Sequence, residues 1–570
     1  MTHTRRALRE IRLAAVSALG ALFLLGARGA SPVQAQVVSG SVVDSASRQP
    51  IPGAVIQLLG ANGEEHGRGL SDARGAFVVR VRGDVRRVRI VRIGFSPRLL
   101  DVSIAAAEPA TRALGDIAMR RIPAFLDPVR VVAAQCRGRS NRGRSPIALI
   151  EQARAGLLTS VVTRDQNPAT MRRLTYERLF EGDSRRPTEQ IVRSDSSTQQ
   201  TRSFRAAQDA GSFVESGFVQ PLGDEQIFFA PDADVLLDDR FAAGYCFRVM
   251  PRDRDRPREI GLGFEPATRR AGRVDVEGAL WIDTVARELR ELSFRYVGLN
   301  RRIEALGPGG SVSFQTLPNG LVIVDRWSMY LIGEVPDTLA SSRPGTVRLS
   351  ARLVEVRNGG ELAAARWSDG TEWRAALGTV TGSARWRDGR PASGATLALG
   401  DTPFRTVVTD AGQYTFEGLL PGSYTVFVDD SALLSIGLDM PTSQRVTTDR
   451  DSTRLELILP TRADVAGRHC PASGPFDPNN RTLFLGRALR TDRAPIEDAI
   501  WGVRLNTPEG WVEVAKDGRT GSNGLMPYCT GLRRGAELEV TVRTPEGLVD
   551  VQRRRLTEPA TIVPFVFPMP

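Results

Sequence analysis

One short pattern occurs three times in this 570-residue chain and constrains its fold more than any other feature. A proline is followed, after a short gap, by an alanine that begins an apolar stretch. The pattern reads SRQPIPGAVIQLLG at 47–60, GRPASGATLALG at 389–400 and DRAPIEDAIWGVRL at 492–505. Because proline cannot donate a ladder hydrogen bond, it ends an incoming strand and sets a turn. The apolar stretch behind it is expected to cross a core, which predicts three related β modules.

The middle copy continues with a second signature, TDAGQYTFEGLLPGSYTVFV at 409–428. Alternate apolar residues, such as Tyr414 and Phe416, place one face of each strand in a core. Gly412 and the Pro421-Gly422 pair supply the turns between strands. The pattern therefore predicts a small antiparallel β-sandwich.

The two signatures together resemble the carboxypeptidase regulatory-like family, which has a transthyretin-like seven-stranded sandwich related to carbohydrate-binding folds. The resemblance is best at 377–460 and also covers 36–120, where Gly75 matches the first turn. It is loosest at 470–570, where Gly535 stands in place of the Pro-Gly turn. The unequal spacing of the copies predicts separate modules along the chain rather than a stacked solenoid.

The chain as a whole is too long for a single core. Between the first two copies, SPIALIEQARAGLLTSVVTR reads as a helix, and segments such as ELRELSFRYVGL read as strands. We predict a mainly β, multidomain fold, with several transthyretin/Ig-like antiparallel sandwich modules and an α+β antiparallel-sheet middle domain. The predicted segments are a signal peptide at 1–35, a regulatory-like sandwich at 36–122, a linker at 123–145, the middle domain at 146–375, a second regulatory-like sandwich at 377–460 and a third, divergent sandwich at 470–570.

The N-terminus has the features of a secretory signal peptide. Arginines precede the apolar stretch LAAVSALGALFLLGA, and the small residues of VQA precede an expected cut at Gln36. No later stretch reaches the roughly 18 apolar residues that a membrane-spanning helix needs. We therefore expect export to the periplasm, outer membrane or cell surface of a bacterium, with outer-membrane association but no transmembrane span.

Four cysteines in an exported chain favour disulfides, and they allow three pairings. We prefer Cys470–Cys529, because both residues lie in the C-terminal module, which leaves Cys136–Cys246. The net charge of +11 is a modest excess and is carried almost entirely by arginine. The basic segment RVRGDVRRVRIVRIGF at 80–95 alternates with apolar residues, which indicates a solvated strand face rather than a phosphate-binding stripe. We expect no nucleic-acid partner.

Reactive residues are scarce. The chain has three histidines, one lysine and no HxxE or GxSxG motif, so zinc carboxypeptidase and Ser-His-Asp chemistry are not supported. The acidic stretch PDADVLLDDR at 231–240 lacks the remaining ligands of a calcium loop, and we interpret it as structural. Carboxylates elsewhere form no specific acid–base motif; the residues considered are Glu259, Glu265, Asp275 and Asp283. We therefore predict no catalytic, cofactor-binding or metal-binding residues, and no cofactor.

These observations favour an exported, non-enzymatic envelope protein that binds, adheres or supports structure through contacts with a glycan or a protein partner. Trp386, in the polar stretch ARWRDGR, is the candidate glycan platform. The alternative is an accessory of TonB-type uptake or a periplasmic carrier. FLDPVRVVAAQC at 125–136 resembles the segment after the sandwich in TonB-dependent receptors, although a last sandwich strand is favoured there. The VDVEGALWIDT hairpin is similar to a lipoprotein-carrier half-barrel, which implies an apolar ligand. A hydrolase that uses unidentified carboxylates is the third hypothesis.

Overall fold

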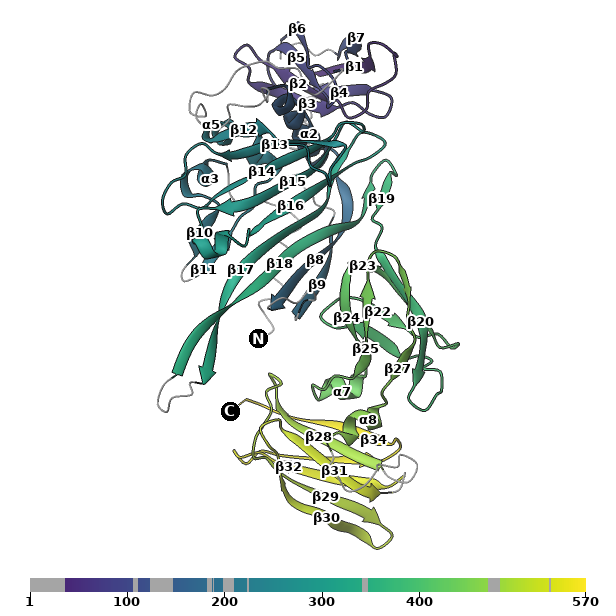
Figure 1. Ribbon diagram of the computed structural model, residues 1–570. Helices are drawn as coiled ribbons and strands as arrows, with labels where there is room; N and C mark the ends of the chain where they lie inside the picture. The colour runs from purple at the N-terminus through teal and green to yellow at the C-terminus, as the bar shows by residue number, and fades with distance from the viewer. Residues whose placement is uncertain are drawn as a thin grey trace, which may run out of the picture. The chain divides into compact units, whose positions relative to one another are not determined.

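The computed structural model describes residues 36–105, 111–122, 147–181, 187, 189–197, 210–222, 225–340, 347–469, 482–532 and 535–569. The predicted signal peptide and the stretch at 125–136 lie outside the described residues. Strands dominate, and most of them pair antiparallel, which confirms the predicted fold class (Figure 1). The chain divides into two compact units: 1–169 with 198–329, and 170–197 with 330–570.

The first copy of the repeated pattern folds into two sheets that enclose one apolar core. In the three-stranded sheet, β1 is central, pairing antiparallel with β4 and parallel with β7. The four-stranded sheet has the order β3-β2-β5-β6. The bounds are β1 Val37–Asp44, β2 Val55–Leu59, β3 Glu65–Leu70, β4 Ala76–Arg80, β5 Val85–Val91, β6 Arg98–Ile104 and β7 Thr111–Met119.

The second copy has the same arrangement of strands. Its first strand, β20, pairs antiparallel with β23 and parallel with β26 and β27, and the second sheet has the order β22-β21-β24-β25. The bounds are β20 Gly378–Trp386, β21 Thr396–Leu399, β22 Arg405–Val407, β23 Gln413–Leu419, β24 Gly422–Val428, β25 Pro441–Thr448, β26 Ser452–Arg454 and β27 Leu457–Leu459.

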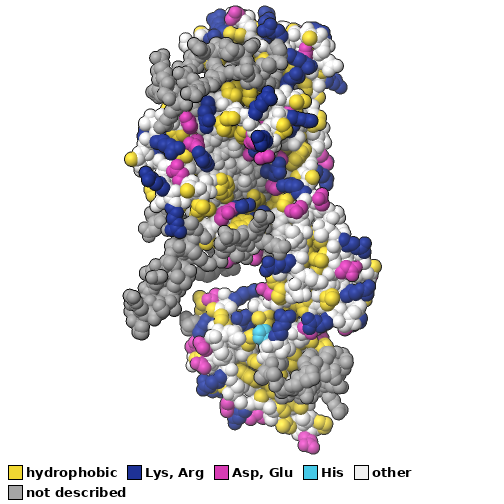
Figure 2. All heavy atoms as spheres, in the orientation of Figure 1, with side chains coloured by type: hydrophobic (Ala, Val, Ile, Leu, Met, Phe, Trp, Pro, Cys, Tyr) yellow, Lys and Arg dark blue, Asp and Glu magenta, His cyan; other side chains and the backbone are white. Residues whose placement is uncertain are grey.

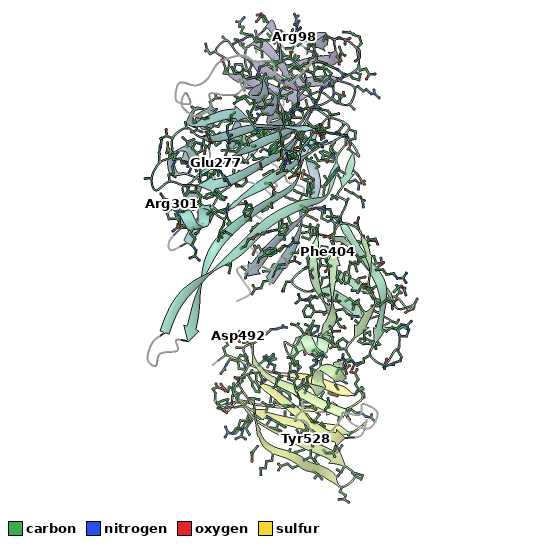
Figure 3. The ribbon with its side chains drawn as sticks, viewed as in Figure 1. Arg98, Glu277, Arg301, Phe404, Asp492 and Tyr528 are labelled. Carbon is green, nitrogen blue, oxygen red and sulfur yellow. The ribbon has the colours of Figure 1, made fainter. Side chains whose placement is uncertain are left out.

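The third copy repeats this topology despite its divergent sequence. Here β28 pairs antiparallel with β31 and parallel with β34, beside a sheet of order β30-β29-β32-β33. Tyr528 on β31 belongs to the apolar core of this sandwich (Figure 3). The bounds are β28 Thr482–Arg490, β29 Ile500–Thr507, β30 Gly510–Arg519, β31 Leu525–Leu532, β32 Glu537–Arg543, β33 Val549–Arg555 and β34 Ala560–Phe567.

The repeated proline has the same place in all three sandwiches. Pro50, Pro391 and Pro495 each form an isolated antiparallel bridge to a residue near the end of the first strand. A glycine with positive φ lies against each proline: Gly75, Gly412 and Gly524 respectively. Each glycine carbonyl accepts a hydrogen bond of 2.8–2.9 Å from a first-strand amide. The proline therefore ends the incoming segment and orients the next strand, as the sequence predicts.

A long antiparallel sheet accounts for most of the region between the first two sandwiches. Its strand order is β12-β13-β14-β15-β16-β17-β18-β8-β9, and β19 pairs with β18. The strand bounds are β8 Ala169–Glu181, β9 Glu189–Ser197, β12 Tyr245–Val249, β13 Glu259–Pro266, β14 Asp275–Asp283, β15 Glu288–Val297, β16 Gly309–Thr316, β17 Val322–Ala340, β18 Val347–Trp367 and β19 Glu372–Arg374. The two compact units divide this region within β17, so the predicted domain boundaries at 146 and 375 stay a prediction.

One long helix, four short helices and a small hairpin lie beside this sheet among the described residues of the first unit. They are α2 Ile147–Gln166, α3 Ala210–Ser216, α4 Ala233–Leu237, α5 Asp239–Gly244, α6 Arg301–Glu304, β10 Val219–Leu222 and β11 Glu225–Phe228. Aromatic rings fill the space between them: Phe213 stacks on Phe218 with ring centroids 4.7 Å apart, and Phe241 stacks on Tyr245 at 3.9 Å. In the part of the chain that the structure describes, no helix has the length and apolar character needed to cross a membrane.

The second and third sandwiches share buried contacts, and the expectation of separate modules along the chain stays a prediction. The helix α7 Ser431–Ser435 lies between β24 and β25 of the second sandwich, and α8 Arg462–Gly467 lies between the two sandwiches in sequence. Ile436, which follows α7, belongs to one buried cluster with Ala463 and Ala466 of α8 and with Leu483 and Leu485 of β28. The second sandwich in turn shares its core with Leu174 and Val192 of β8 and β9. The motif spacing did not reveal this, because the apolar contacts involve helices that are not part of the repeated motifs.

Candidate ligand-binding cleft

The first sandwich is held to the rest of its unit by helix α2 (Figure 1). Gln152, which is 3% exposed, accepts a hydrogen bond from the Gly94 amide at 2.6 Å and donates one to the Phe95 carbonyl at 3.2 Å. Gly156 lets the helix approach closely, because a Cβ there would lie 2.8 Å from Ile93 and 2.9 Å from Leu289. The sandwich loop and β15 thus both contact the helix at Gly156.

Polar contacts continue along the same helix. Glu151 pairs with Arg89 of β5, whose guanidinium also donates to Gln57. At the C-terminal end of the helix, Gln166 donates to the Arg68 carbonyl at 2.6 Å. Arg89 therefore forms an ion pair with α2. The alternating pattern of the basic segment at 80–95 predicts instead that its arginines are solvated.

A cleft of about 500 Å³ lies where the end of α2 meets β3 and β4. This volume is within the range of small-ligand sites in proteins. We call it the β3–α2 cleft. Its lining residues are Glu65, Gly67, Arg68, Val78, Arg80, Arg82, Asp165 and Gln166.

Opposite charges meet on one side of the cleft. The guanidinium of Arg68 lies 3.4 Å from a carboxylate oxygen of Glu65 and 3.4 Å from one of Asp165. Asp165 also pairs with Arg164 at 2.8 Å. Although burial acts to lower it, the hydrogen bonds with Asp234 and Asp165 raise the pKa of Arg164 above its ordinary value. This arginine therefore stays charged beside Asp165.

Two arginines on the other side have a different environment. Val78 and Arg80 occupy alternate, exposed positions of β4, and Arg82 follows two residues later. The Arg82 amide donates to the His66 carbonyl at 2.9 Å, which fixes the backbone beside β3. Within the described residues, neither the Arg80 nor the Arg82 side chain has an acidic partner within 4 Å. The cleft thus combines unpaired cationic donors with carboxylate acceptors.

The sequence-predicted platform Trp386 is at the end of β20, in the second sandwich. Its side chain is half-buried and packs against the sandwich core. Its backbone amide donates to the Arg390 carbonyl at 2.9 Å, closing a turn. A role for Trp386 in glycan binding stays a prediction.

The acidic stretch at 231–240 stabilises local structure. Asp232 caps α4 by accepting from the Val235 amide at 2.9 Å, and Asp238 caps α5 by accepting from the Arg240 amide at 2.8 Å. Asp234 is paired with Arg164 at 2.7 Å. Across the described ranges, no three His, Cys, Asp or Glu side chains gather in a way that would hold a metal ion.

The carboxylates considered for acid–base chemistry are dispersed over β13 and β14. Glu259 and Asp283 are cross-strand neighbours, but Glu259 pairs with Arg256 at 3.0 Å and Asp283 accepts two turn amides at 2.8 Å. Asp275 lies at the other end of β14, where burial raises its pKa and Arg273, 2.8 Å away, opposes this. Glu265 lies on β13 opposite Cys246 of β12. The arrangement fits sheet stabilisation.

The predicted disulfides each include a residue outside the described part of the chain. Cys246 is on β12 and is 9% exposed, whereas Cys136 is not described. Cys529 is on β31 beside the cluster shared by the second and third sandwiches, and Cys470 is not described. The pairings stay a prediction.

Sequence reasoning missed the β3–α2 cleft. Arg80 and Arg82 begin the basic segment that we interpreted as a strand face, and the exposed arginine side chains fit that interpretation. The cleft exists because α2, more than 60 residues further along, ends beside them. A charge pattern alone gives no sign of such a distant partner.

Comparison with known proteins supports the fold of the first copy. The sequence model of the carboxypeptidase regulatory-like domain family matches residues 37–120. No curated protein sequence matches the chain. Sequence patterns made 377–460 the best copy, whereas the family match is to the first one.

Solved structures give weak likenesses. The Bacillus anthracis TIE protein is 10% identical, with a TM-score of 0.15, over 61% of this chain and 63% of its own length. A streptococcal ancillary pilin is 9% identical, with a TM-score of 0.14, over 46% of this chain and 83% of its own. The major pilin subunit of Bacillus cereus is 6% identical, with a TM-score of 0.13, over 94% of this chain and 98% of its own. These TM-scores carry no functional argument.

The family match and the strand topology agree for one part of the chain. The matched residues include all seven strands of the first sandwich, from β1 to β7. The repeated proline and the glycine that contacts it lie inside the match. Residues 37–120 are therefore a carboxypeptidase regulatory-like domain.

Proposed function

We propose that this chain is an exported, non-enzymatic envelope protein that binds a glycan or a protein partner. The observation that carries the proposal is the β3–α2 cleft, which is built from a regulatory-like sandwich and a helix of the adjoining region. Its lining offers guanidinium donors, carboxylate acceptors and an amide, which suits recognition of a polar ligand. Neither of the histidines that follow the predicted signal peptide lines the cleft.

The predicted leader and the three sandwiches support an envelope location. On the surface in view, basic and acidic side chains are interspersed (Figure 2). Such a surface suits specific polar contacts better than bulk attraction to a polyanion.

The periplasmic-carrier alternative requires an apolar groove in the middle region. The stacked pairs Phe213–Phe218 and Phe241–Tyr245 instead fill space between the helices and the sheet with the protein's own rings. Phe213, Phe218 and Phe241 are each at most 1% exposed. This packing supports the binding role over the carrier role.

A sedimentation assay tests the proposal. The purified mature chain is mixed with envelopes from producing cells that lack the gene, and the bound fraction is measured after extraction of either glycans or proteins from those envelopes. We expect saturable binding that one of the two extractions abolishes. Binding that does not saturate, or no binding to any envelope fraction, would contradict the proposed function.

A further inference from the structure

The two arginines without an acidic partner define one end of the β3–α2 cleft. Val78, Arg80 and Arg82 occupy every second position along β4 and the residues that follow it. All three are exposed and line the cleft. A guanidinium donates two parallel hydrogen bonds to a carboxylate, which fixes both the distance and the orientation of the ligand. This end of the cleft therefore favours a carboxylate.

Two carboxylates in the same lining favour hydroxyl donors. Glu65 accepts from Gln57 at 2.9 Å and contacts Arg68, and Asp165 contacts Arg68 and Arg164. Both side chains line the cleft, and a carboxylate can accept about four hydrogen bonds. A ligand with several negative groups would meet repulsion here, whereas a ligand with hydroxyl groups would donate to these oxygens.

The middle of the cleft provides space and one apolar contact. The volume of about 500 Å³ is in the range of small-ligand sites. The Val78 side chain, 69% exposed, is part of the lining and offers an apolar surface to C–H groups. Gly67 allows β3 to approach the backbone of β4 closely, because a Cβ there would lie 2.3 Å from the Arg80 carbonyl oxygen.

From these features we infer that the β3–α2 cleft binds a sugar that carries a carboxylate, as in a uronate unit of an acidic glycan. The carboxylate pairs with Arg80 and Arg82, and the ring hydroxyls donate to Glu65 and Asp165. This inference deepens the proposed function, on which it rests, by naming the ligand class.

Calorimetric titration of the purified mature chain tests the inference. The probes are a galacturonic acid trisaccharide, the galactose trisaccharide with the same linkage, and inorganic phosphate. We expect the acidic sugar to bind at least tenfold more tightly than either of the others. The double variant R80Q/R82Q should weaken that binding at least tenfold. The control is R98Q, because Arg98 is an exposed arginine on the edge strand β6 of the same sandwich (Figure 3).

The outcomes distinguish a failure of the ligand assignment from a failure of the proposed function. Equal binding of phosphate or of the neutral sugar, or an affinity that R80Q/R82Q leaves unchanged, would overturn the inference. Equal losses in R98Q and in R80Q/R82Q would also overturn it, because the effect would then come from net charge. If the mature chain still binds envelopes in the sedimentation assay after such a result, the proposed function stands while the ligand assignment fails.

Discussion

At the scale of single residues, the glycine that contacts each repeated proline explains why the pattern recurs. Gly524 has φ of 69°, and a Cβ there would lie 2.6 Å from the Ala488 carbonyl oxygen and 3.1 Å from Pro495. The same carbonyl accepts the Ile496 amide at 3.0 Å. Proline, glycine and first strand thus form one turn unit, which tolerates few substitutions.

We predict that G524A destabilises the third sandwich more than G547A does. Both glycines have positive φ, where an L-residue costs about 1–2 kcal/mol, but a Cβ at Gly547 meets nothing within 4 Å. The additional backbone clash should therefore appear only in G524A. In calorimetry, 1 kcal/mol corresponds to about 4–8 °C for a domain of 60–100 residues. We expect the G524A transition to be several degrees lower, and equal shifts would contradict the role of the turn.

A second residue-scale prediction concerns Glu539, which is 7% exposed and pairs with Arg553 at 2.9 Å and Arg504 at 2.8 Å. The hydrogen bond from Arg553, helped by Arg504, lowers the pKa of Glu539 below its ordinary value of 4.5. Because the folded-state pKa is depressed, the stabilisation is present above pH 4.5 and is lost as the pH falls through the folded-state pKa.

The variant E539Q should therefore lose protection of the β32 and β33 amides from hydrogen exchange at pH 7. The difference from wild type should shrink as the pH falls below 4.5. The control E513Q changes an exposed glutamate on β30 of the same sheet and should match wild type at both pH values. A difference between E539Q and wild type that is independent of pH would show that the carboxylate charge is not responsible.

At the scale of elements, α2 determines whether the first sandwich and its neighbouring sheet act as one body. We predict that Q152L loosens this contact, because the Gly94 amide and the Phe95 carbonyl would lose their buried partner. Each unsatisfied group costs about 1–3 kcal/mol. Faster hydrogen exchange in 147–166 of Q152L would be the readout. The control is R154Q, because Arg154 is on the same helix but is partly exposed, and this variant should exchange like wild type. If Q152L also exchanges like wild type, Gln152 is not needed to hold the first sandwich against α2.

The cysteines make a further element-scale prediction. Peptide mapping of the exported, non-reduced protein should recover Cys136 linked to Cys246 and Cys470 linked to Cys529. C246S should free only the first pair, and C529S only the second. Recovery of a crossed pair, or of free thiols at all four positions, would contradict the prediction.

The strands and helices also show which features of the fold can be predicted from the sequence and which cannot. Alternation and turn residues predict the antiparallel sandwich of the three copies, because strands bury one face and several turns contain a proline or a positive-φ glycine. Contacts made by the helices, which are not part of the repeated motifs, were not predictable in this way. Ile436 and Ala463 join two sandwiches, and Asp165 completes the cleft. Such contacts depend on how separate elements pack, which local periodicity does not encode.

At the scale of the whole molecule, each compact unit contains at least one sandwich that shares contacts with non-repeated elements. The first unit also holds the β3–α2 cleft. An exported binding protein needs a site that stays accessible outside the cell and a fold that survives there. The proposed function therefore depends first on where the chain resides.

Envelope fractionation of producing cells, combined with protease treatment of intact cells, tests this claim most directly. The account predicts that the chain, cleaved after its leader, is found in the envelope fraction and is degraded by protease added outside, while a periplasmic control protein is spared. A chain that stays in the cytoplasm with its leader intact would contradict the account.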